Sequence, residues 1–430
     1  MARIVLTCWG SHGDIDPFLG FGLALESRGH EVTIATLDHF RSLVEGLGLG
    51  FRSIRPTVNP DDSQLIERIM HRSRGSEYLL REILFPAIED MYADVRAAAD
   101  GADLLVSHPI TFATPVVAEA TGIPWASVVL APTSLFSRYD MPVVPPAPWL
   151  KSLEHLGPWP GIMLMSFVRH VLNRWPDSVY ALRQRLGLPR GANPIVDGQH
   201  SPRLVLALFS RLLGAPQRDW PAHVEVTGHA FYDAPHGTSL APDVQAFLDA
   251  GAPPLVFTLG SSVVMIEKAF WQHSIDAVER LQARAVLLVG PAVERVRSLV
   301  ASLGPSASQR ILVVDRAPHS LLFPRASAIV HQCGVGTTAQ SLRSGRPVLA
   351  VPYAHDQPDN AWRAERLGVA RIVRVPRYRG RRVAAVLDEL TRNPAYAAAA
   401  ERVARSVRAE RGLEAACDAL ERAFALRKSQ

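Results

Sequence analysis

The segment HQCGVGTT, residues 331–338, ends a strand-like apolar run, turns through two glycines and enters a segment with helical spacing. A buried strand of a parallel sheet delivers the chain to the carboxyl edge, where Gly334 and Gly336 allow the backbone to approach a ligand closely. The following helix is expected to begin at Thr337 and to stop at Gly345. Because the first N–H groups of a helix lack partners within it, this turn predicts a site for an anion such as a phosphate.

Polar side chains accompany the glycine turn. His331 at the strand end is expected to add a hydrogen bond to the same anion, and the hydroxyls of Thr337 and Thr338 either cap the helix or bind the ligand. The next strand ends in YAHDQPDN, which places further polar groups beside the anion: Asp356, Gln357 and Asn360. These groups suit sugar hydroxyls, although Asp356 ahead of Pro358 is also typical of a helix cap.

Two further strand ends lead to the same edge. FTLGSS supplies Ser261 and Ser262, and DRAPHSLLFP supplies Arg316 and His319. Since parallel strands end at one edge of a sheet, we expect these four strand ends to converge on one crevice.

Strand-like and helical segments alternate along most of the chain. The expected strands are residues 3–9, 31–36, 103–108, 125–131 and 203–209 in the first half, and 254–262, 285–290, 310–315, 328–333 and 347–352 in the second. This alternation over 430 residues predicts two doubly wound α/β domains. The polar stretch YDAPHGTSLAPD separates them, which divides the chain into domains 1–232 and 233–410 and a closing helix, 411–430, for which packing back on the first domain is one arrangement.

Composition excludes several classes of protein. Lys and Arg number 46 against 41 Asp and Glu, and this scattered excess lacks the basic run with interleaved aromatics of a nucleic-acid-binding protein. The three cysteines, Cys8, Cys333 and Cys417, lack the spacing of zinc ligands or of a disulfide framework. Neither a signal peptide nor an apolar run of about 18 residues is found. We therefore expect a cytoplasmic protein without a nucleic-acid partner or a transmembrane segment.

One segment interrupts the alternation. Residues 141–160 contain PVVPPAPW and GPWP, and residues 161–175 follow as an apolar segment of helical length. A long irregular insertion in an α/β domain is often a binding loop. The apolar helix has three interpretations: a core helix, a wall of an acceptor pocket, or a peripheral contact with a membrane surface.

These motifs together resemble a known family. HQCGVGTTAQSLRSGRPVLAVPYAHDQPDN, preceded by RAPHSLLFPRAS, is similar to the donor-binding signature of glycosyltransferase family 1, whose members have the GT-B fold and use nucleotide-activated sugars. GSHGDIDPFLGFGLALESRGHEVTIAT resembles the opening of the bacterial branch with vancomycin-type, sterol and rhamnolipid glycosyltransferases, the last through the rhamnosyltransferase catalytic subunit. The resemblance implies two Rossmann-like domains facing across a cleft, with the donor on the second domain and the acceptor on the first.

The resemblance also implies roles for individual residues. The diphosphate-binding set is His331, the amides of Gly336 and Thr337, and Ser261 or Ser262; the sugar-binding set is Asp356 and Gln357. Arg316 stands where plant members carry a tryptophan that stacks on uracil, and a guanidinium can stack in its place. Cys333 replaces a glycine of many relatives and is interpreted as a small buried residue.

The turn GSHGDIDP supplies candidates for a catalytic base. Inverting transfer needs an acceptor hydroxyl that is deprotonated on the face opposite the departing nucleotide, so the base is expected from the first domain. Asp14 falls where the vancomycin-type branch carries an aspartate and is the first choice; His12 is the second. His108 at a strand end either orients the base or the acceptor or is a satisfied strand-end residue. Asp14 alternatively caps a helix that starts near Pro17.

The expected reaction is inverting O-glycosylation of a lipophilic or aromatic small molecule from a UDP-glucose or dTDP-rhamnose type of donor. Asp14-Ile15-Asp16 also matches the DxD triplet of metal-dependent glycosyltransferases, but it lies in the half opposite the predicted donor site, so no metal or other cofactor is expected. Two alternatives stay open: an auxiliary member that binds nucleotide sugar without transfer, and a nucleotide-sugar epimerase.

Overall fold

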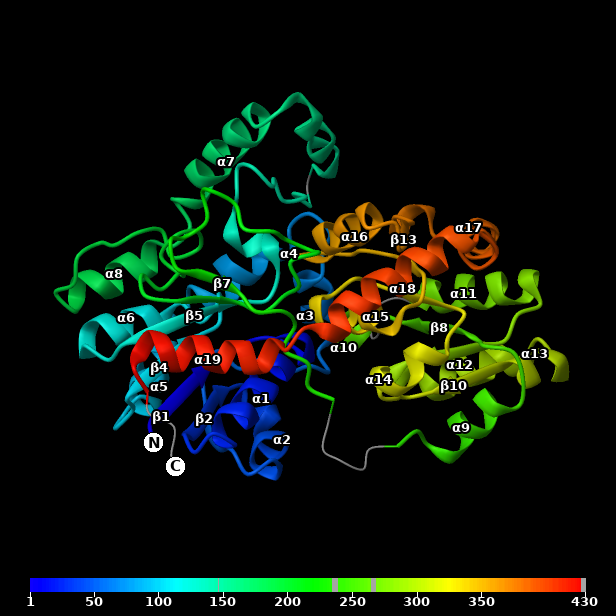
Figure 1. The fold of residues 1–430 in the computed structure, drawn as a ribbon, viewed down its shortest axis with the longest axis horizontal. Helices are drawn as coiled ribbons and strands as arrows, with labels where there is room; N and C mark the ends of the chain where they lie inside the picture. The colour runs from blue at the N-terminus through cyan, green and yellow to red at the C-terminus, as the bar shows by residue number, and fades with distance from the viewer. Residues whose placement is uncertain (146, 234–238, 264–267, 427–430) are drawn as a thin grey trace. The chain divides into compact units, whose positions relative to one another are not determined.

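Two α/β units make up the computed structural model, which describes residues 1–145, 147–233, 239–263 and 268–426. Unit 1 comprises residues 1–59, 74–232 and 410–430, and unit 2 comprises residues 60–73 and 233–409. The chain therefore enters unit 2 twice (Figure 1).

Unit 1 is built on a seven-stranded parallel sheet with the order β3-β2-β1-β4-β5-β6-β7. Its strands are β1 (Arg3–Thr7), β2 (Glu31–Thr36), β3 (Gly50–Ser53), β4 (Leu104–Ser107), β5 (Trp125–Val129), β6 (Val205–Ala207) and β7 (Val224–Val226). The central strands are short apolar runs such as RIVLT, and they are buried because helices cover both faces of the sheet.

The helices of unit 1 follow the strands as expected for crossover connections. They are α1 (His12–Glu26), α2 (Arg41–Gly46), α4 (Gly75–Tyr78), α5 (Ile88–Ala98), α6 (Ala113–Thr121), α7 (Trp159–Leu172), α8 (Asp177–Arg185) and α19 (Gly412–Phe424). The short helix η4 (Pro148–Leu156) precedes α7.

The last helix of the chain, α19, packs along α1 (Figure 1). Gly20 of α1 lies near Leu413 of α19: a side-chain carbon in place of the glycine would make an ordinary contact with the leucine at 3.5 Å. At the other end of the contact, Arg28 donates hydrogen bonds to Asp418 (2.6 Å) and Glu421 (2.9 Å). The end of the sequence is thus part of the same unit as its beginning.

Unit 2 is built on a six-stranded parallel sheet with the order β10-β9-β8-β11-β12-β13. The strands are β8 (Leu255–Thr258), β9 (Ala285–Leu288), β10 (Ile311–Val314), β11 (Ala328–His331), β12 (Val348–Ala350) and β13 (Ala370–Ile372). The helices are α3 (Ser63–Ile69), α9 (Pro242–Asp249), α10 (Gly260–Val263), α11 (Lys268–Leu281), α12 (Val293–Ala301), α13 (Pro305–Arg310), α14 (His319–Leu322), α15 (Val335–Ser344), α16 (Gln357–Arg366), α17 (Gly380–Arg392) and α18 (Pro394–Ala409).

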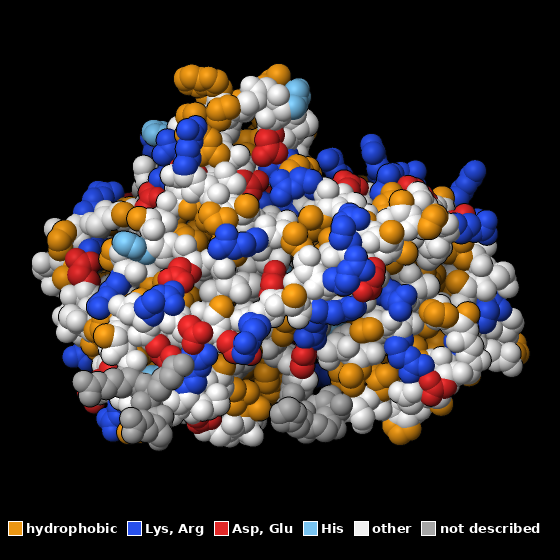
Figure 2. All heavy atoms as spheres, viewed as in Figure 1, with side chains coloured by type: hydrophobic (Ala, Val, Ile, Leu, Met, Phe, Trp, Pro, Cys, Tyr) orange, Lys and Arg blue, Asp and Glu red, His pale blue; other side chains and the backbone are white. Residues whose placement is uncertain are grey.

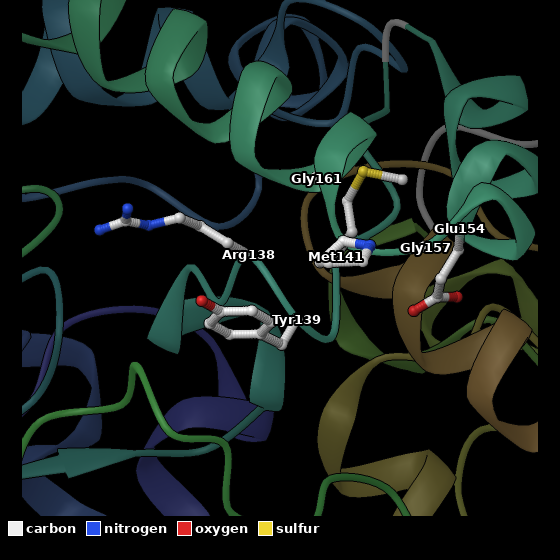
Figure 3. Close-up of a pocket in the computed structure, with 7 residues that line it drawn as sticks. Arg138, Tyr139, Met141, Glu154, Gly157 and Gly161 are labelled. Atoms are coloured by element: carbon white, nitrogen blue, oxygen red, sulfur yellow. The ribbon is translucent and has the colours of Figure 1, made fainter.

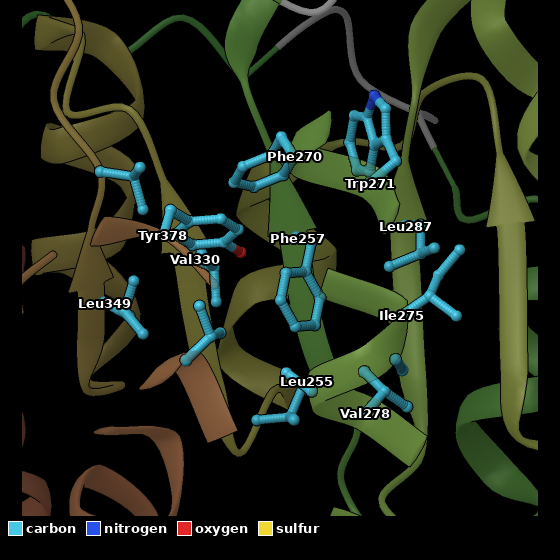
Figure 4. Packing of buried hydrophobic residues seen from close by; sticks show 14 of the residues in the cluster. Leu255, Phe257, Phe270, Trp271, Ile275, Val278, Leu287, Val330, Leu349 and Tyr378 are labelled. Atoms are coloured by element: carbon cyan, nitrogen blue, oxygen red, sulfur yellow. The ribbon is translucent and has the colours of Figure 1, made fainter. Parts of the chain in front are cut away.

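A large apolar core supports the strands of unit 2 (Figure 4). Phe257 of β8 and Val330 of β11 are fully buried in this core. The two strands that lead to the glycine turns are therefore anchored by apolar packing. Phe270 of α11 stacks on Tyr378, with ring centroids 4.7 Å apart. This packing fixes the carboxyl edge of the sheet, from which the loops with the predicted donor-binding residues extend.

The structure differs from the sequence-based expectation in several places. Three short edge strands were not expected, β3, β7 and β13, and the segment 60–73 belongs to unit 2 although the sequence placed it in the first domain. Helix α1 begins at His12, five residues before Pro17, and α15 begins at Val335, two residues before Thr337. None of the helices in the described ranges has the length and hydropathy of a membrane span.

Candidate active site

The glycine turn of unit 2 joins β11 to α15 at the carboxyl edge of the sheet. Cys333 occupies the left-handed region with φ +66°, a strained conformation for a residue with a side chain. The first helical hydrogen bond runs from the Thr338 N–H to the Gly334 carbonyl oxygen (2.9 Å). The amides of Val335, Gly336 and Thr337 therefore precede the helical ladder and form the N-terminal end of α15, where the sequence predicts an anion site. The threonine side chains, by contrast, are largely buried.

His331 is arranged differently from the expectation that it faces the anion. Its Nδ1 accepts a hydrogen bond from the Cys333 N–H (3.0 Å), and its Nε2 lies 2.9 Å from the Ser341 hydroxyl. Burial, together with the nearby His319, lowers the pKa of His331 to about 3, so the ring is neutral at neutral pH. With both ring nitrogens engaged and 1% of the residue exposed, His331 supports the turn from inside rather than presenting a donor to a ligand.

Gln332 is a site residue that sequence reasoning missed. A side-chain carbon at Gly260, which has φ +63°, would collide with Nε2 of Gln332, so the amide lies directly against the turn after β8. Gln332 is also the nearest side chain to the Cβ position of Gly334, and its Oε1 is buried without a hydrogen-bond partner in the described part of the chain. The sequence did contain a signal for this residue, because Gln332 lies between His331 and the two glycines of the turn. The residue is a neutral hydrogen-bonding group between two turns that the sequence predicts to bind a ligand.

The loop after β12 is tied to the glycine turn. Asn360 donates hydrogen bonds from Nδ2 to the Cys333 carbonyl oxygen (3.0 Å) and to Oδ2 of Asp356 (2.6 Å). Oε1 of Gln357 accepts from the amides of Tyr353 (2.9 Å) and of the residue after it (3.2 Å). The structure thus brings these three predicted residues together at the sheet edge. Through these hydrogen bonds, Asn360 and the side-chain carbonyl of Gln357 also stabilise the conformation of the loops.

The remaining predicted donor residues lie on other loops of unit 2. Ser261 and Ser262 belong to α10, but their side chains lie outside the described part of the structure. The Arg316 side chain is 83% exposed, which leaves its planar face accessible for stacking. His319 stacks on Phe323 with ring centroids 4.3 Å apart, and burial lowers its pKa to about 4. His319 is therefore an uncharged residue packed against an aromatic ring.

In unit 1, Asp14 is fixed at the start of α1. Its Oδ2 accepts hydrogen bonds from the Ser11 N–H (2.8 Å) and hydroxyl (3.2 Å). Ser11 is the N-cap of α1, so Asp14 is the third residue of the helix and completes a capping box, instead of capping a helix that starts near Pro17. Its Oδ1 lies 3.6 Å from Nε2 of His108, which follows β4. Gly10 has φ +142°, and a side chain there would collide with the Asp14 carboxylate. Oδ2 of Asp14 thus stabilises the start of α1, whereas Oδ1 faces His108.

The surroundings of Asp14 favour the ionised carboxylate. Burial raises its pKa, but the interactions with His108 and the hydrogen bonds from Ser11 outweigh burial, and the net pKa lies below the ordinary value. The Asp14 side chain is 31% exposed, whereas that of His108 is only 6% exposed. Nδ1 of His108 is buried without a hydrogen-bond partner among the described residues. A substrate therefore has access to the carboxylate and much less to the imidazole.

His12 forms a second, more exposed pair in the same turn. Its Nδ1 lies 3.3 Å from Oδ1 of Asp16, and the two side chains are 50% and 41% exposed. The His12 ring also meets Phe40 edge to face, with centroids 5.1 Å apart. Asp14 and Asp16 thus have different partners, and the described residues contain no cluster of three or more His, Cys, Asp or Glu side chains that could hold a metal ion.

A hollow of about 280 Å³ lies in unit 1 beside the segment that interrupts the α/β alternation (Figure 3). It is lined by Arg138, Tyr139, Met141, Glu154, Gly157, Pro158 and Gly161. In Figure 3 the labelled side chains come from the loop after β5 and from the η4 and α7 segment. The irregular segment therefore borders a hollow of unit 1, and its role as a binding loop stays a prediction.

Family models match both halves of the chain. Residues 274–415 match the model described as "Erythromycin biosynthesis protein CIII-like, C-terminal domain", and residues 4–133 match "Glycosyltransferase family 28 N-terminal domain". O-mycaminosyltylonolide 6-deoxyallosyltransferase of Streptomyces fradiae is 33% identical over 97% of each chain. Sterol 3-beta-glucosyltransferase of Yarrowia lipolytica is 27% identical over 96% of this chain, which spans 28% of that longer protein.

Solved structures share the fold. The glycotransferase of kitacinnamycin superposes with a TM-score of 0.73 at 22% identity, covering 98% of this chain and 99% of that one. Glycosyltransferase VinC in complex with dTDP superposes with a TM-score of 0.68 at 20% identity, with the same coverage. The predicted GT-B fold and family are confirmed. The chain belongs to glycosyltransferase family 1 and is an enzyme that transfers a sugar to a small-molecule acceptor.

Proposed function

We propose that this enzyme catalyses inverting transfer of a hexose from a nucleoside diphosphate sugar to a hydroxyl of a lipophilic or aromatic acceptor. The observation that carries the proposal is the ionised, partly exposed carboxylate of Asp14, held by Ser11 and faced by His108. The relative that acts on O-mycaminosyltylonolide favours a macrolide-like acceptor and a deoxyhexose. The structure of VinC in complex with dTDP favours a dTDP-sugar over a UDP-sugar.

The acceptor is activated in unit 1. Oδ1 of Asp14 accepts the proton as the acceptor oxygen forms its bond to the anomeric carbon, while the bond from that carbon to the diphosphate oxygen breaks. A carboxylate with a lowered pKa is a weak base in the ground state, so proton transfer is late and concerted with displacement. His108, 3.6 Å from Oδ1, fixes the carboxylate and stabilises its charge before the reaction. His12 is the second candidate for the base.

The donor is bound in unit 2. The amides of Gly336 and Thr337 at the start of α15 bind the diphosphate and stabilise the charge that develops on it during transfer. Gln332 donates a further hydrogen bond, and Asp356 binds a sugar hydroxyl. Arg316 stacks on the base. We infer that charge stabilisation by these groups makes a metal ion unnecessary, and the three buried free thiols suit a reducing cytoplasm.

The decisive experiment is an assay with dTDP-rhamnose, dTDP-glucose and UDP-glucose, each with and without EDTA, against macrolide, sterol and flavonoid acceptors. A product whose anomeric configuration is inverted relative to the donor, and whose sugar is released by acid hydrolysis as expected of an O-glycoside, would support inverting O-transfer. Product with retained configuration would refute the mechanism. Conversion of the donor to its epimer without an acceptor would identify an epimerase. Nucleotide binding without product from any pair would identify an auxiliary protein.

A further inference from the structure

Large apolar side chains are exposed in one short stretch of unit 1. Trp149, Leu156, Trp159, Met163 and Phe167 are between 62% and 72% exposed, and all lie in η4 or α7. The other exposed large apolar residues of the described chain, such as Leu303, are scattered. We call these five residues the apolar patch. Figure 2 shows orange side chains gathered over the segment that carries α7. Such clustering is typical of an interaction surface.

Helix α7 has a buried face and an exposed face, both apolar. Gly161, Met165 and Leu172 are buried, and Gly161 lies against the Arg138 carbonyl oxygen. Trp159, Met163 and Phe167 follow one another at a spacing of four residues on the exposed face. The interpretation of this segment as a core helix is therefore wrong for half of its surface. These three large side chains are 65% to 72% exposed, so packing within the described part of the chain does not account for them.

The charge around the patch is positive on balance. Arg174 is exposed beside it, whereas Arg169 pairs with Asp197 and the buried Lys151 pairs with Asp140 and Glu154. A helix that lies in the interface of an anionic bilayer typically has tryptophan, phenylalanine and methionine on its apolar face and a basic residue beside them, which we call the rim. With 14 residues, α7 suits the plane of the interface rather than a span.

The same charges disfavour a second copy of the chain as the occupant. In a two-fold symmetric dimer each patch faces its own equivalent, so Arg174 would meet a surface whose acidic side chains, Glu154 and Asp197, are already paired with Lys151 and Arg169. An anionic lipid surface instead offers an apolar layer for the patch and phosphate groups for the rim. We propose that the apolar patch binds this enzyme peripherally to anionic bilayers. The proposal does not depend on the identity of the donor or the acceptor.

Vesicle flotation of the full chain tests this proposal. Phosphatidylcholine vesicles with roughly 30% phosphatidylglycerol should bind the protein, pure phosphatidylcholine should bind it more weakly, and binding should fall with added salt. The triple variant Trp159→Ser, Met163→Ser, Phe167→Ser should bind at least about tenfold more weakly, because interfacial binding scales with buried apolar area. Leu303→Ser, at an exposed site outside the patch, should bind like wild type.

Charge reversal provides a second measurement. Arg174→Glu should weaken binding to the anionic vesicles, whereas Arg295→Glu, at an exposed arginine of α12, should change it little. Thermal unfolding of each variant establishes that it is folded. Absence of wild-type binding to anionic vesicles at low salt, or equal binding by the triple variant, would overturn the proposal. A wild-type dimer in light scattering that the triple variant loses would instead assign the patch to a second copy.

Discussion

Replacing Asp14 by asparagine removes the charge of the proposed base while keeping its size. In the structure, Oδ2 of Asp14 accepts from the Ser11 amide and hydroxyl, and the amide oxygen of asparagine can take over that role. The variant loses the charge that faces His108 at 3.6 Å. Since one hydrogen-bond acceptor is retained, we expect a loss of unfolding free energy of only about 1 kcal/mol. The fold and the donor site of unit 2 should therefore be preserved.

The catalytic effect of Asp14→Asn should be much larger. A positioned general base contributes about 10² to 10⁴ in rate, which corresponds to roughly 3 to 5 kcal/mol of activation free energy. We expect kcat to fall by this factor while the Kd for the nucleotide, measured by calorimetry, changes by less than about twofold. Asp16→Asn is the matched control in the same helix turn, and it should retain most of the activity if Asp14 is the base.

The pH profile separates Asp14 from His12. The pKa of Asp14 lies below the ordinary aspartate value, so the carboxylate is ionised throughout pH 5 to 8 and kcat/KM should be flat towards the acid side of that range. A histidine base would lose activity below about pH 6.5. An acid limb between pH 6 and 7 that disappears in His12→Asn, together with near-normal activity of Asp14→Asn, would refute the assignment of Asp14.

Further variants test the supporting structure of both units. Gln332→Ala should raise the nucleotide Kd, measured by calorimetry, by roughly 3- to 10-fold, because one hydrogen bond to the nucleotide is lost. An unchanged Kd would show that Gln332 is not part of the donor site. Gly260→Ala should weaken binding at least as much, because the new carbon collides with the Gln332 amide, and an unaltered Kd would argue against that contact. Gly10→Ala should lower kcat by displacing the Asp14 carboxylate, with little effect on nucleotide binding. The folded-state pKa of His331 is about 3, so at mildly acidic pH this histidine binds a proton only in the unfolded chain. The free energy of unfolding in urea should therefore be highest above about pH 6.5 and should fall as the pH drops towards 3. His331→Gln should reduce this pH dependence, and an identical pH dependence in the variant would contradict the assigned pKa.

The sequence predicted the architecture well because apolar runs and glycine turns are local signals. All ten expected strands are present in the two parallel sheets, and the turn after β11 lies at the carboxyl edge of its sheet. The three missed strands, β3, β7 and β13, have three or four residues and are weakly patterned edge strands, such as GFRS. Such strands form because a neighbouring strand offers hydrogen bonds, which a local pattern does not report.

Side-chain direction within the site was harder to predict. The sequence placed His331 correctly at the strand end, but the orientation of its ring depends on Ser341, ten residues further along the chain. Gln332 points towards Gly260, more than seventy residues earlier in the sequence, so only the folded sheet brings the two together. The predicted loop residues Asp356 and Asn360 are adjacent as expected, because they share one helix start.

The division of the chain into noncontiguous units has a consequence for making hybrid enzymes. Unit 1 contains residues 410–430, where α19 packs along α1, and unit 2 contains residues 60–73. An exchange of donor halves with one junction after Tyr232 would import a foreign α19 against a native α1, and with it unmatched partners for Arg28. A hybrid that returns to the native sequence at residue 410 keeps that helix pair intact. A hybrid that keeps both units intact therefore exchanges two segments of this chain, 60–73 and 233–409, rather than a C-terminal half.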